Sequence, residues 1–362
     1  IIARAYAIAM AGRPGPVVIS LPEDTLAQYE DVEPFPFQEA PEPGPSDDEI
    51  TKVQALLLQA QKPILLIGGS RWNSETVNAL EEWAKAWQIP VATTFRRQNL
   101  FNHDHECYAG DAGIMINPRL RARIKESDLV LMIGTRLSEV ASQDYSLVQM
   151  NPKQKLIHVY PGAEELGRVY IADLPILATP TTFIQSLAKL APPSEKKWKK
   201  LAHNAHADYR YWTLIEIESA DDDLNMNFVI QHMREGVARD AIVCHGAGNY
   251  GMWVQRFWNY RNFGSQLAPI SGSMGYGLPA AIAAKLTCPE KEVYCFAGDG
   301  CFQMVHQELA TAIQEKLHIV VLVVDNGQYG TIRMHQEMRY PGRRSATAIT
   351  NPDFAAIAKA SG

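Results

Sequence analysis

The stretch from residue 298 to residue 326 most constrains the fold, because it reads as two strands joined by a helix. Gly298-Asp299-Gly300 opens a helix-like run, and the apolar run from Ile319 to Val324 ends at Asp325-Asn326-Gly327. A crossover of this length joins neighbouring parallel strands and brings their carboxyl ends together. We therefore expect Asp299 and Asn326 to lie side by side at the ligand-binding edge of a doubly wound sheet.

Asp299 and Asn326 both offer oxygen atoms. A carboxylate, an amide oxygen and a free backbone carbonyl suit a hard cation that also holds phosphate oxygens, which indicates Mg²⁺. Asp-Gly and Asn-Gly are also common turn pairs, so either pair alone would indicate only a turn. The predicted crossover between the two pairs favours the metal site.

Helix and strand patterns alternate from residue 48 to residue 190, which predicts a second α/β domain. A helix at 48–60 and a helix around 76–87 alternate with nearly continuous apolar runs. These runs cover residues 63–69, 90–94, 129–134 and 155–159. Such runs separated by helices are typical of a parallel sheet that is covered on both faces. The pattern predicts a Rossmann-like central domain at 48–190, followed by a doubly wound parallel-sheet domain at 227–362.

The remaining segments look like the tail of another domain and two linkers. A helix over residues 1–10 and a strand over 17–20 cannot bury a core alone, so residues 1–27 are interpreted as the end of a further domain. Residues 28–47 are rich in proline and predict an extended linker. Residues 191–226 predict a helical linker, with Lys196 to Lys200 on a solvated helix face. Because the chain lacks an initiator Met and stops inside a helical pattern, we expect a fragment of a longer protein.

Charge and cysteine content exclude several classes of protein. With 362 residues and a net charge of −6, the chain has no global basic field for nucleic acid or an anionic membrane. No apolar run reaches the length of a transmembrane helix. The five cysteines form no CxxC pair, which disfavours a disulfide framework or a zinc site and favours the cytoplasm.

Two glycine-rich segments follow in the last domain. Gly246 to Gly251 matches GxGxxG, but the window that should hold the ribose-binding acid, residues 262–269, contains none, which disfavours an NAD site. The segment still offers backbone N–H groups to a diphosphate. Within Ser271 to Pro279, Met274 stands alone among small residues. One interpretation of Met274 is a core residue that fills a gap in the packing.

On these motifs the chain resembles the thiamine-diphosphate-dependent enzymes related to acetolactate synthase, benzoylformate decarboxylase and pyruvate decarboxylase. Gly298-Asp299-Gly300 with Asn326 is the most specific match, and Ser271 to Pro279 is the next. The resemblance implies thiamine diphosphate and Mg²⁺ as cofactors. It also implies that residues 1–27 end the pyrimidine-binding domain, and that residues 227–362 form most of the diphosphate-binding domain.

The resemblance also implies roles for individual residues. Asp299, the Asn326 side chain and the Gln328 carbonyl would bind Mg²⁺, and Met274 would hold the cofactor in a bent shape. The implied cofactor-binding residues are Gly246, Ala247, Gly248, Asn249, Ser273, Met274, Gly298, Asp299, Gly300, Cys301, Asn326, Gln328 and Tyr329. Gly300 and Cys301 would open a helix that faces the phosphates. The family's catalytic glutamate has no match here, so no catalytic residue is assigned and the fragment alone is expected to be inactive.

The resemblance leaves several functions open. The first is an acetolactate synthase-like carboligase acting on 2-oxo acids, and the alternative is a decarboxylase of the benzoylformate type. An oxidoreductase and a non-catalytic homologue are further interpretations. Loops at 95–99 and 108–113 match regions where synthases hold FAD, but Ser138 to Ala141 depart from the synthase pattern after Arg136, which argues against FAD. The family's active sites between subunits imply a homodimer or homotetramer.

Overall fold

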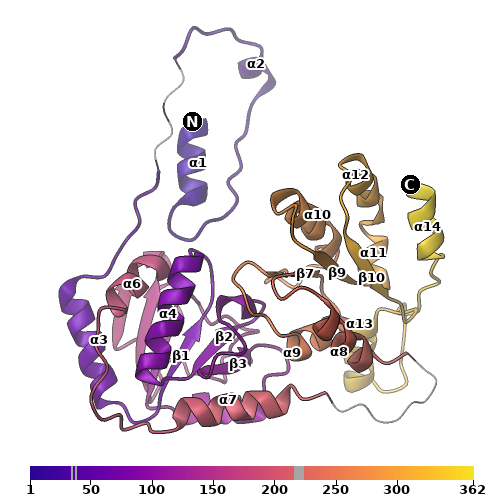
Figure 1. The fold of residues 1–362 in the computed structure, drawn as a ribbon. Coiled ribbons are helices and arrows are strands. Elements are labelled where there is room, and N and C mark those ends of the chain that lie inside the picture. The colour runs from indigo at the N-terminus through magenta and orange to yellow at the C-terminus, as the bar shows by residue number, and fades with distance from the viewer. Residues whose placement is uncertain (34–35, 37–38, 216–223) are drawn as a thin grey trace. The chain divides into compact units, whose positions relative to one another are not determined.

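The computed structural model describes residues 1–33, 36, 39–215 and 224–362 (Figure 1). These residues form two compact units. The first comprises Ile1–Val91 and Ala122–Leu201, and the second comprises Ala92–Arg121 and Ala202–Gly362. The predicted linkers at 28–47 and 191–226 lie partly outside the described residues.

The first unit is an α/β unit with a parallel sheet. Strands β1 (Pro63–Ile67), β4 (Leu129–Ile133), β5 (Lys155–Tyr160) and β6 (Leu174–Leu177) pair in that order, all parallel. Its helices are α1 (Ile2–Met10), α2 (Glu23–Leu26), α3 (Asp47–Gln59), α4 (Ser74–Trp87) and α6 (Pro180–Leu187), with α5 (Pro118–Glu126) at the boundary of the units. Every residue of β1 and β4 is buried, as the continuous apolar runs predict.

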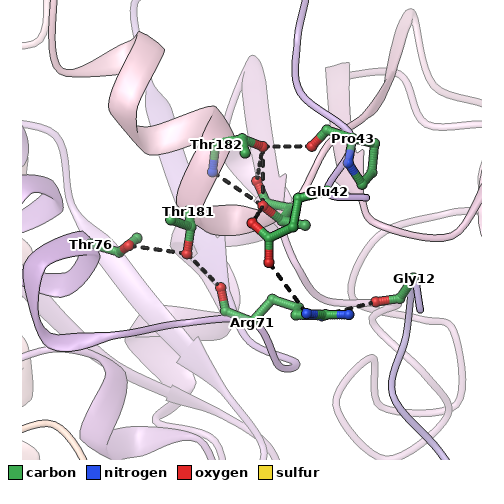
Figure 2. Close-up of polar contacts among 8 residues, drawn as sticks. Gly12, Glu42, Pro43, Arg71, Thr76, Thr181 and Thr182 are labelled. Atoms are coloured by element: carbon green, nitrogen blue, oxygen red, sulfur yellow. Dashed lines mark hydrogen bonds and ion pairs between the residues drawn. The ribbon is translucent and has the colours of Figure 1, made fainter. Parts of the chain in front are cut away.

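Polar contacts fix the chain before α3 to the start of α6 (Figure 2). The Thr182 hydroxyl donates to the Pro43 carbonyl at 2.7 Å, and the Arg71 guanidinium lies 3.3 Å from the Glu42 carboxylate. α3 itself begins at a capping box, in which the Ser46 hydroxyl and the Glu49 carboxylate each accept from the other's backbone N–H. The end of the proline-rich segment is thus anchored by side chains and by the Thr179 N–H, which donates to the Pro43 carbonyl at 3.1 Å.

The second unit contains a four-stranded parallel sheet, in the order β10-β9-β7-β8. Figure 1 labels β7, β9 and β10 of this sheet. The strands of this sheet are β7 (Ile242–His245), β8 (Gln266–Leu267), β9 (Val293–Gly298) and β10 (Val320–Val324). Two further strands, β2 (Val91–Thr94) and β3 (Tyr108–Ala112), come earlier in the chain and are not part of this sheet. Its helices are α7 (Leu201–Trp212), α8 (Met226–Gly236), α9 (Tyr250–Phe257), α10 (Gly277–Thr287), α11 (Asp299–Gln303), α12 (Leu309–Gln314), α13 (Gly330–Arg339) and α14 (Phe354–Ser361).

Successive side chains of this sheet enter two different apolar clusters. Cys295 packs with α10 in one cluster, whereas Phe296 packs with α8 and α9 in the other. Because successive strand residues point to opposite faces, the two clusters are the two covered faces of one sheet. The predicted α/β class with parallel sheets is therefore confirmed.

Three local predictions are wrong. Residues 17–20 form no strand, since no described strand pairs with them, and Val18 is 92% exposed. The lysine run lies in a turn before α7 instead of on a helix, because Trp198 is buried and its indole N–H donates to the Trp87 carbonyl at 2.8 Å. Most of the predicted loop at 108–113 is strand β3, where Tyr108 is fully buried and stacks on His103. Separately, no helix in the described ranges is long and apolar enough to cross a membrane.

A partly buried aspartate, Asp111, lies near the end of β3. The Gln255 amide donates to Asp111 Oδ2 at 2.7 Å, while Asp111 Oδ1 has no hydrogen-bond partner among the described residues. Burial raises the pKa of Asp111 from its ordinary 3.8 to about 7, more than the Gln255 hydrogen bond and the Arg96 charge lower it.

We expect this carboxyl group to make stability fall as pH rises. Between about pH 4 and pH 7 the native state holds the proton and the unfolded chain has released it, so the free energy of unfolding decreases by up to about 1.4 kcal/mol per pH unit. Above pH 7 the contribution is constant. Asp111→Asn should flatten the dependence in urea unfolding at pH 5, 6, 7 and 8. Equal slopes in the two proteins would contradict the assignment.

Candidate functional site

The register of the second sheet places the two predicted metal ligands at one edge. Val324 at the end of β10 pairs with Gly298 at the end of β9. Asp299 directly follows β9, and Asn326 is the second residue after β10. The crossover between them is formed by α11, a short 3₁₀ turn and α12. The juxtaposition that the sequence predicts is therefore present in the structure.

A cavity of about 480 Å³ opens at this edge. Its lining comes from the turn after β7, the glycine-rich loop before α10, the start of α11 and the loop after β10. The lining residues are Met226, Ala247, Gly248, Asn249, Tyr250, Trp253, Gly272, Met274, Gly298, Asp299, Gly300, Cys301, Val324, Asn326, Gln328, Tyr329, Gly330, Thr331 and Ile332. All of the predicted cofactor residues except Gly246 and Ser273 line it.

Gly246 and Ser273 lie elsewhere. Gly246 is buried, and its N–H donates to the Tyr250 hydroxyl at 3.1 Å. Ser273 is exposed, and its hydroxyl lies 3.5 Å from that of Ser271. Gly246 therefore supports the wall through Tyr250, a residue that the sequence analysis did not single out.

The cavity wall requires glycine where aromatic rings approach the backbone. A Cβ atom at Gly300 would lie 2.7 Å from Cε1 of Tyr329, and one at Gly248 would lie 2.8 Å from Cε1 of Tyr250. Gly248 also has a φ of +153°, at the margin of the region that favours glycine. The two glycines thus allow the rings of Tyr329 and Tyr250 to lie against the backbone at the cavity wall.

The Asp299 carboxylate is buried and held on both oxygens. Oδ1 accepts from the Gly300 N–H at 2.9 Å, and Oδ2 accepts from the Asn351 amide at 2.8 Å. Asp299 is 4% exposed. Asn351 lies 52 positions from Asp299 in the chain. It belongs to none of the glycine-rich or strand-end motifs described above.

The loop after β10 is shaped by a tight turn. Gly327 has a φ of +63°, and its N–H donates to Asp325 Oδ1 at 3.0 Å. The Gln328 carbonyl accepts from the Gly330 N–H at 2.9 Å, and the Gln328 side-chain oxygen accepts from Arg333. The Arg333 side chain is thus engaged with this loop, and His335 is exposed.

The donor set at this edge fits a hard cation with a phosphate ligand. Asp299 offers a carboxylate, Asn326 an amide oxygen and Gln328 a carbonyl, which are the oxygen ligands that Mg²⁺ takes. In the described ranges, no three His, Cys, Asp or Glu side chains gather into a metal cluster. The site would therefore take its remaining ligands from a bound molecule, as Mg²⁺ does with phosphates.

Cys301, His245 and His306 have structural contacts. The Cys301 thiol donates to the Ala247 carbonyl at 2.9 Å, which ties the start of α11 to the turn after β7. Burial, together with the nearby Arg96 charge, lowers the pKa of His245 to about 4, so this ring is neutral at physiological pH. His306 is partly buried, and its Nδ1 lies 3.2 Å from the Gln303 carbonyl.

Two family models match the chain. The thiamine pyrophosphate enzyme central domain matches residues 50–187, and the thiamine pyrophosphate enzyme C-terminal TPP binding domain matches residues 246–362. The second match contains most of the residues that line the cavity. The chain belongs to the thiamine pyrophosphate enzymes.

Among curated proteins the chain is similar to acetolactate synthases over its whole length. It is 30% identical to the acetolactate synthase large subunit of Corynebacterium glutamicum, and matches 59% of that protein. It is 31% identical to the large subunit of Mycobacterium tuberculosis and to that of Lactococcus lactis, matching 60% and 63% of them. The chain thus spans about 60% of the length of these relatives.

Proposed function

We propose that the protein is a thiamine-diphosphate- and Mg²⁺-dependent enzyme that makes or breaks the bond next to the carbonyl of a 2-oxo acid, as an acetolactate synthase-like carboligase. The observation that carries this proposal is the cavity at the strand edge, where Asp299 and Asn326 meet within the TPP-binding domain. The similarity to acetolactate synthases supports the carboligase over other reactions of the family.

Each part of the cavity has a proposed task. Asp299, Asn326 and the Gln328 carbonyl would hold Mg²⁺, and Ala247, Gly248 and Asn249 in the turn after β7 would offer backbone N–H groups to the diphosphate. Met274, partly buried at the cavity wall, would support the cofactor ring. Thiamine diphosphate, when bound, supplies the electron sink for cleavage next to the carbonyl.

A decarboxylase of the benzoylformate type is the second candidate. The departure of Ser138 to Ala141 from the synthase pattern favours this second candidate. So does Arg136, whose guanidinium lies 3.3 Å from the Glu165 carboxylate. This arrangement leaves Arg136 paired within its own unit. Product analysis of the full-length protein with a 2-oxo acid distinguishes the two, since a carboligase gives a two-substrate product and a decarboxylase gives a free aldehyde.

The proposal extends to the intact protein. We propose that residues 1–27 end a pyrimidine-binding domain, 48–190 form the central domain and 227–362 the diphosphate-binding domain. The glutamate that drives loss of the cofactor proton would come from the rest of the pyrimidine domain, so the chain alone would be inactive. A cytoplasmic homodimer or homotetramer is the proposed form of the enzyme.

We expect thiamine diphosphate to bind this chain only when Mg²⁺ is present. The diphosphate and the strand edge both carry negative charge, so the cation must bridge them. Calorimetric titration of thiamine diphosphate into the protein, with Mg²⁺ and then with EDTA, measures this dependence. Equal affinity in EDTA would contradict the metal site while leaving the cavity as a ligand site.

A further inference from the structure

Asn351 joins the two strand ends that carry the proposed metal ligands. Its amide nitrogen donates to Asp299 Oδ2 at 2.8 Å and to Asp325 Oδ1 at 2.6 Å. The Asn351 side-chain oxygen accepts a hydrogen bond from the Gln303 amide. Both N–H groups and the oxygen of the Asn351 side chain are therefore used, and one of the three partners, Asp299, lines the cavity.

Backbone pairing brings Asn351 to this place. Gln328 and Ala348 form an antiparallel bridge, the Tyr329 N–H donates to the Thr347 carbonyl at 2.9 Å, and the Ile349 N–H donates to the Gly327 carbonyl at 2.8 Å. In this antiparallel register, the position opposite Asp325 is Asn351. The segment after α13 therefore runs back along the loop after β10, and it places the Asn351 amide between the carboxylates of Asp299 and Asp325.

We propose that Asn351 is a positioning residue for the cation site: it orients the Asp299 carboxylate and fixes the separation of the β9 and β10 ends. The inference rests on the proposed function. Asp299 and Asp325 carry like charges at neighbouring strand ends, and an amide that donates to both is suited to hold them together. Groups that hydrogen-bond a ligating carboxylate typically change metal affinity 10–100-fold when removed.

The test measures metal affinity directly. Mn²⁺ replaces Mg²⁺ as the probe, and electron paramagnetic resonance follows the free Mn²⁺ signal in the presence of thiamine diphosphate. Asn351→Leu removes both donors at similar side-chain volume and should weaken Mn²⁺ binding roughly 10–100-fold. Asn262→Leu is the matched control, because Asn262 is exposed and its amide donates to the Arg239 carbonyl at 3.1 Å, away from the proposed metal ligands in the chain. It should bind Mn²⁺ as the wild type does.

The unfolding temperature in EDTA separates positioning from structural support. A positioning role predicts weak Mn²⁺ binding by a variant with near-native circular dichroism and a small change in this temperature. If Asn351→Leu does not fold, Asn351→Ser carries the same prediction. Wild-type affinity in a folded variant would overturn the role of Asn351 and leave the proposed function standing. Absence of Mn²⁺ binding by the wild-type protein would overturn both.

Discussion

Asp299→Asn is expected to abolish Mg²⁺-dependent binding of thiamine diphosphate. The substitution keeps the size of the side chain and an oxygen for the Gly300 N–H, but it removes the only carboxylate among the three proposed metal ligands. A divalent cation loses its strongest ligand at a buried position, where the charge of the carboxylate is least screened. We expect affinity to fall at least 100-fold, by calorimetric titration of thiamine diphosphate at fixed Mg²⁺.

Asp353→Asn is the matched control for this loss of charge. Asp353 caps α14, where its Oδ1 accepts from the Ala356 N–H at 2.9 Å, and Asn caps helices about as well as Asp. The control should keep wild-type affinity. Binding by Asp299→Asn at the wild-type level would show that Asp299 is only a turn residue, and the metal site at this edge would have to be abandoned.

The candidate site divides into a part that the sequence predicts and a part that it does not. Asp299 and Asn326 were predicted together because each follows a continuous apolar strand, and the short crossover requires those strands to be parallel neighbours. Asn351 was not predicted, because it reaches the site through an antiparallel pairing of residues 347–349 with 327–329. That pairing is tertiary, and neither periodicity nor a motif marks it.

The wrong predictions have the same origin. The apolar pattern of residues 17–20 suits a strand, but a strand forms only where another strand pairs with it. The resemblance to synthases implies a loop at 108–113, yet Tyr108 to Ala112 form β3, in which the Tyr108 ring is fully buried. Local pattern thus indicates which segments lie in a core, and tertiary contacts decide what structure they adopt.

Gly69→Ala is expected to cause the largest loss of stability that we predict. Gly69 follows β1 with a φ of +72°, and Gly134 follows β4 with a φ of +69°. A Cβ atom at Gly69 would lie 1.8 Å from the Gly134 carbonyl oxygen, a backbone atom that cannot rotate away. The adjacent strands are held in register by the pair Ile67 and Ile133, so relief of the overlap must separate two buried strand ends. We expect a cost of more than about 4 kcal/mol in urea unfolding.

Gly167→Ala separates the steric part of this cost from the conformational part. Gly167 has a similar φ of +78°, but a Cβ atom there would meet no atom within 4 Å. Alanine at Gly167 should therefore cost only the left-handed strain, about 1–2 kcal/mol. If the two variants lose similar stability, backbone strain alone explains the effect, and the close approach of Gly69 to Gly134 does not constrain this sheet. A much larger loss at Gly69 means that the two glycines are required for β1 and β4 to end side by side.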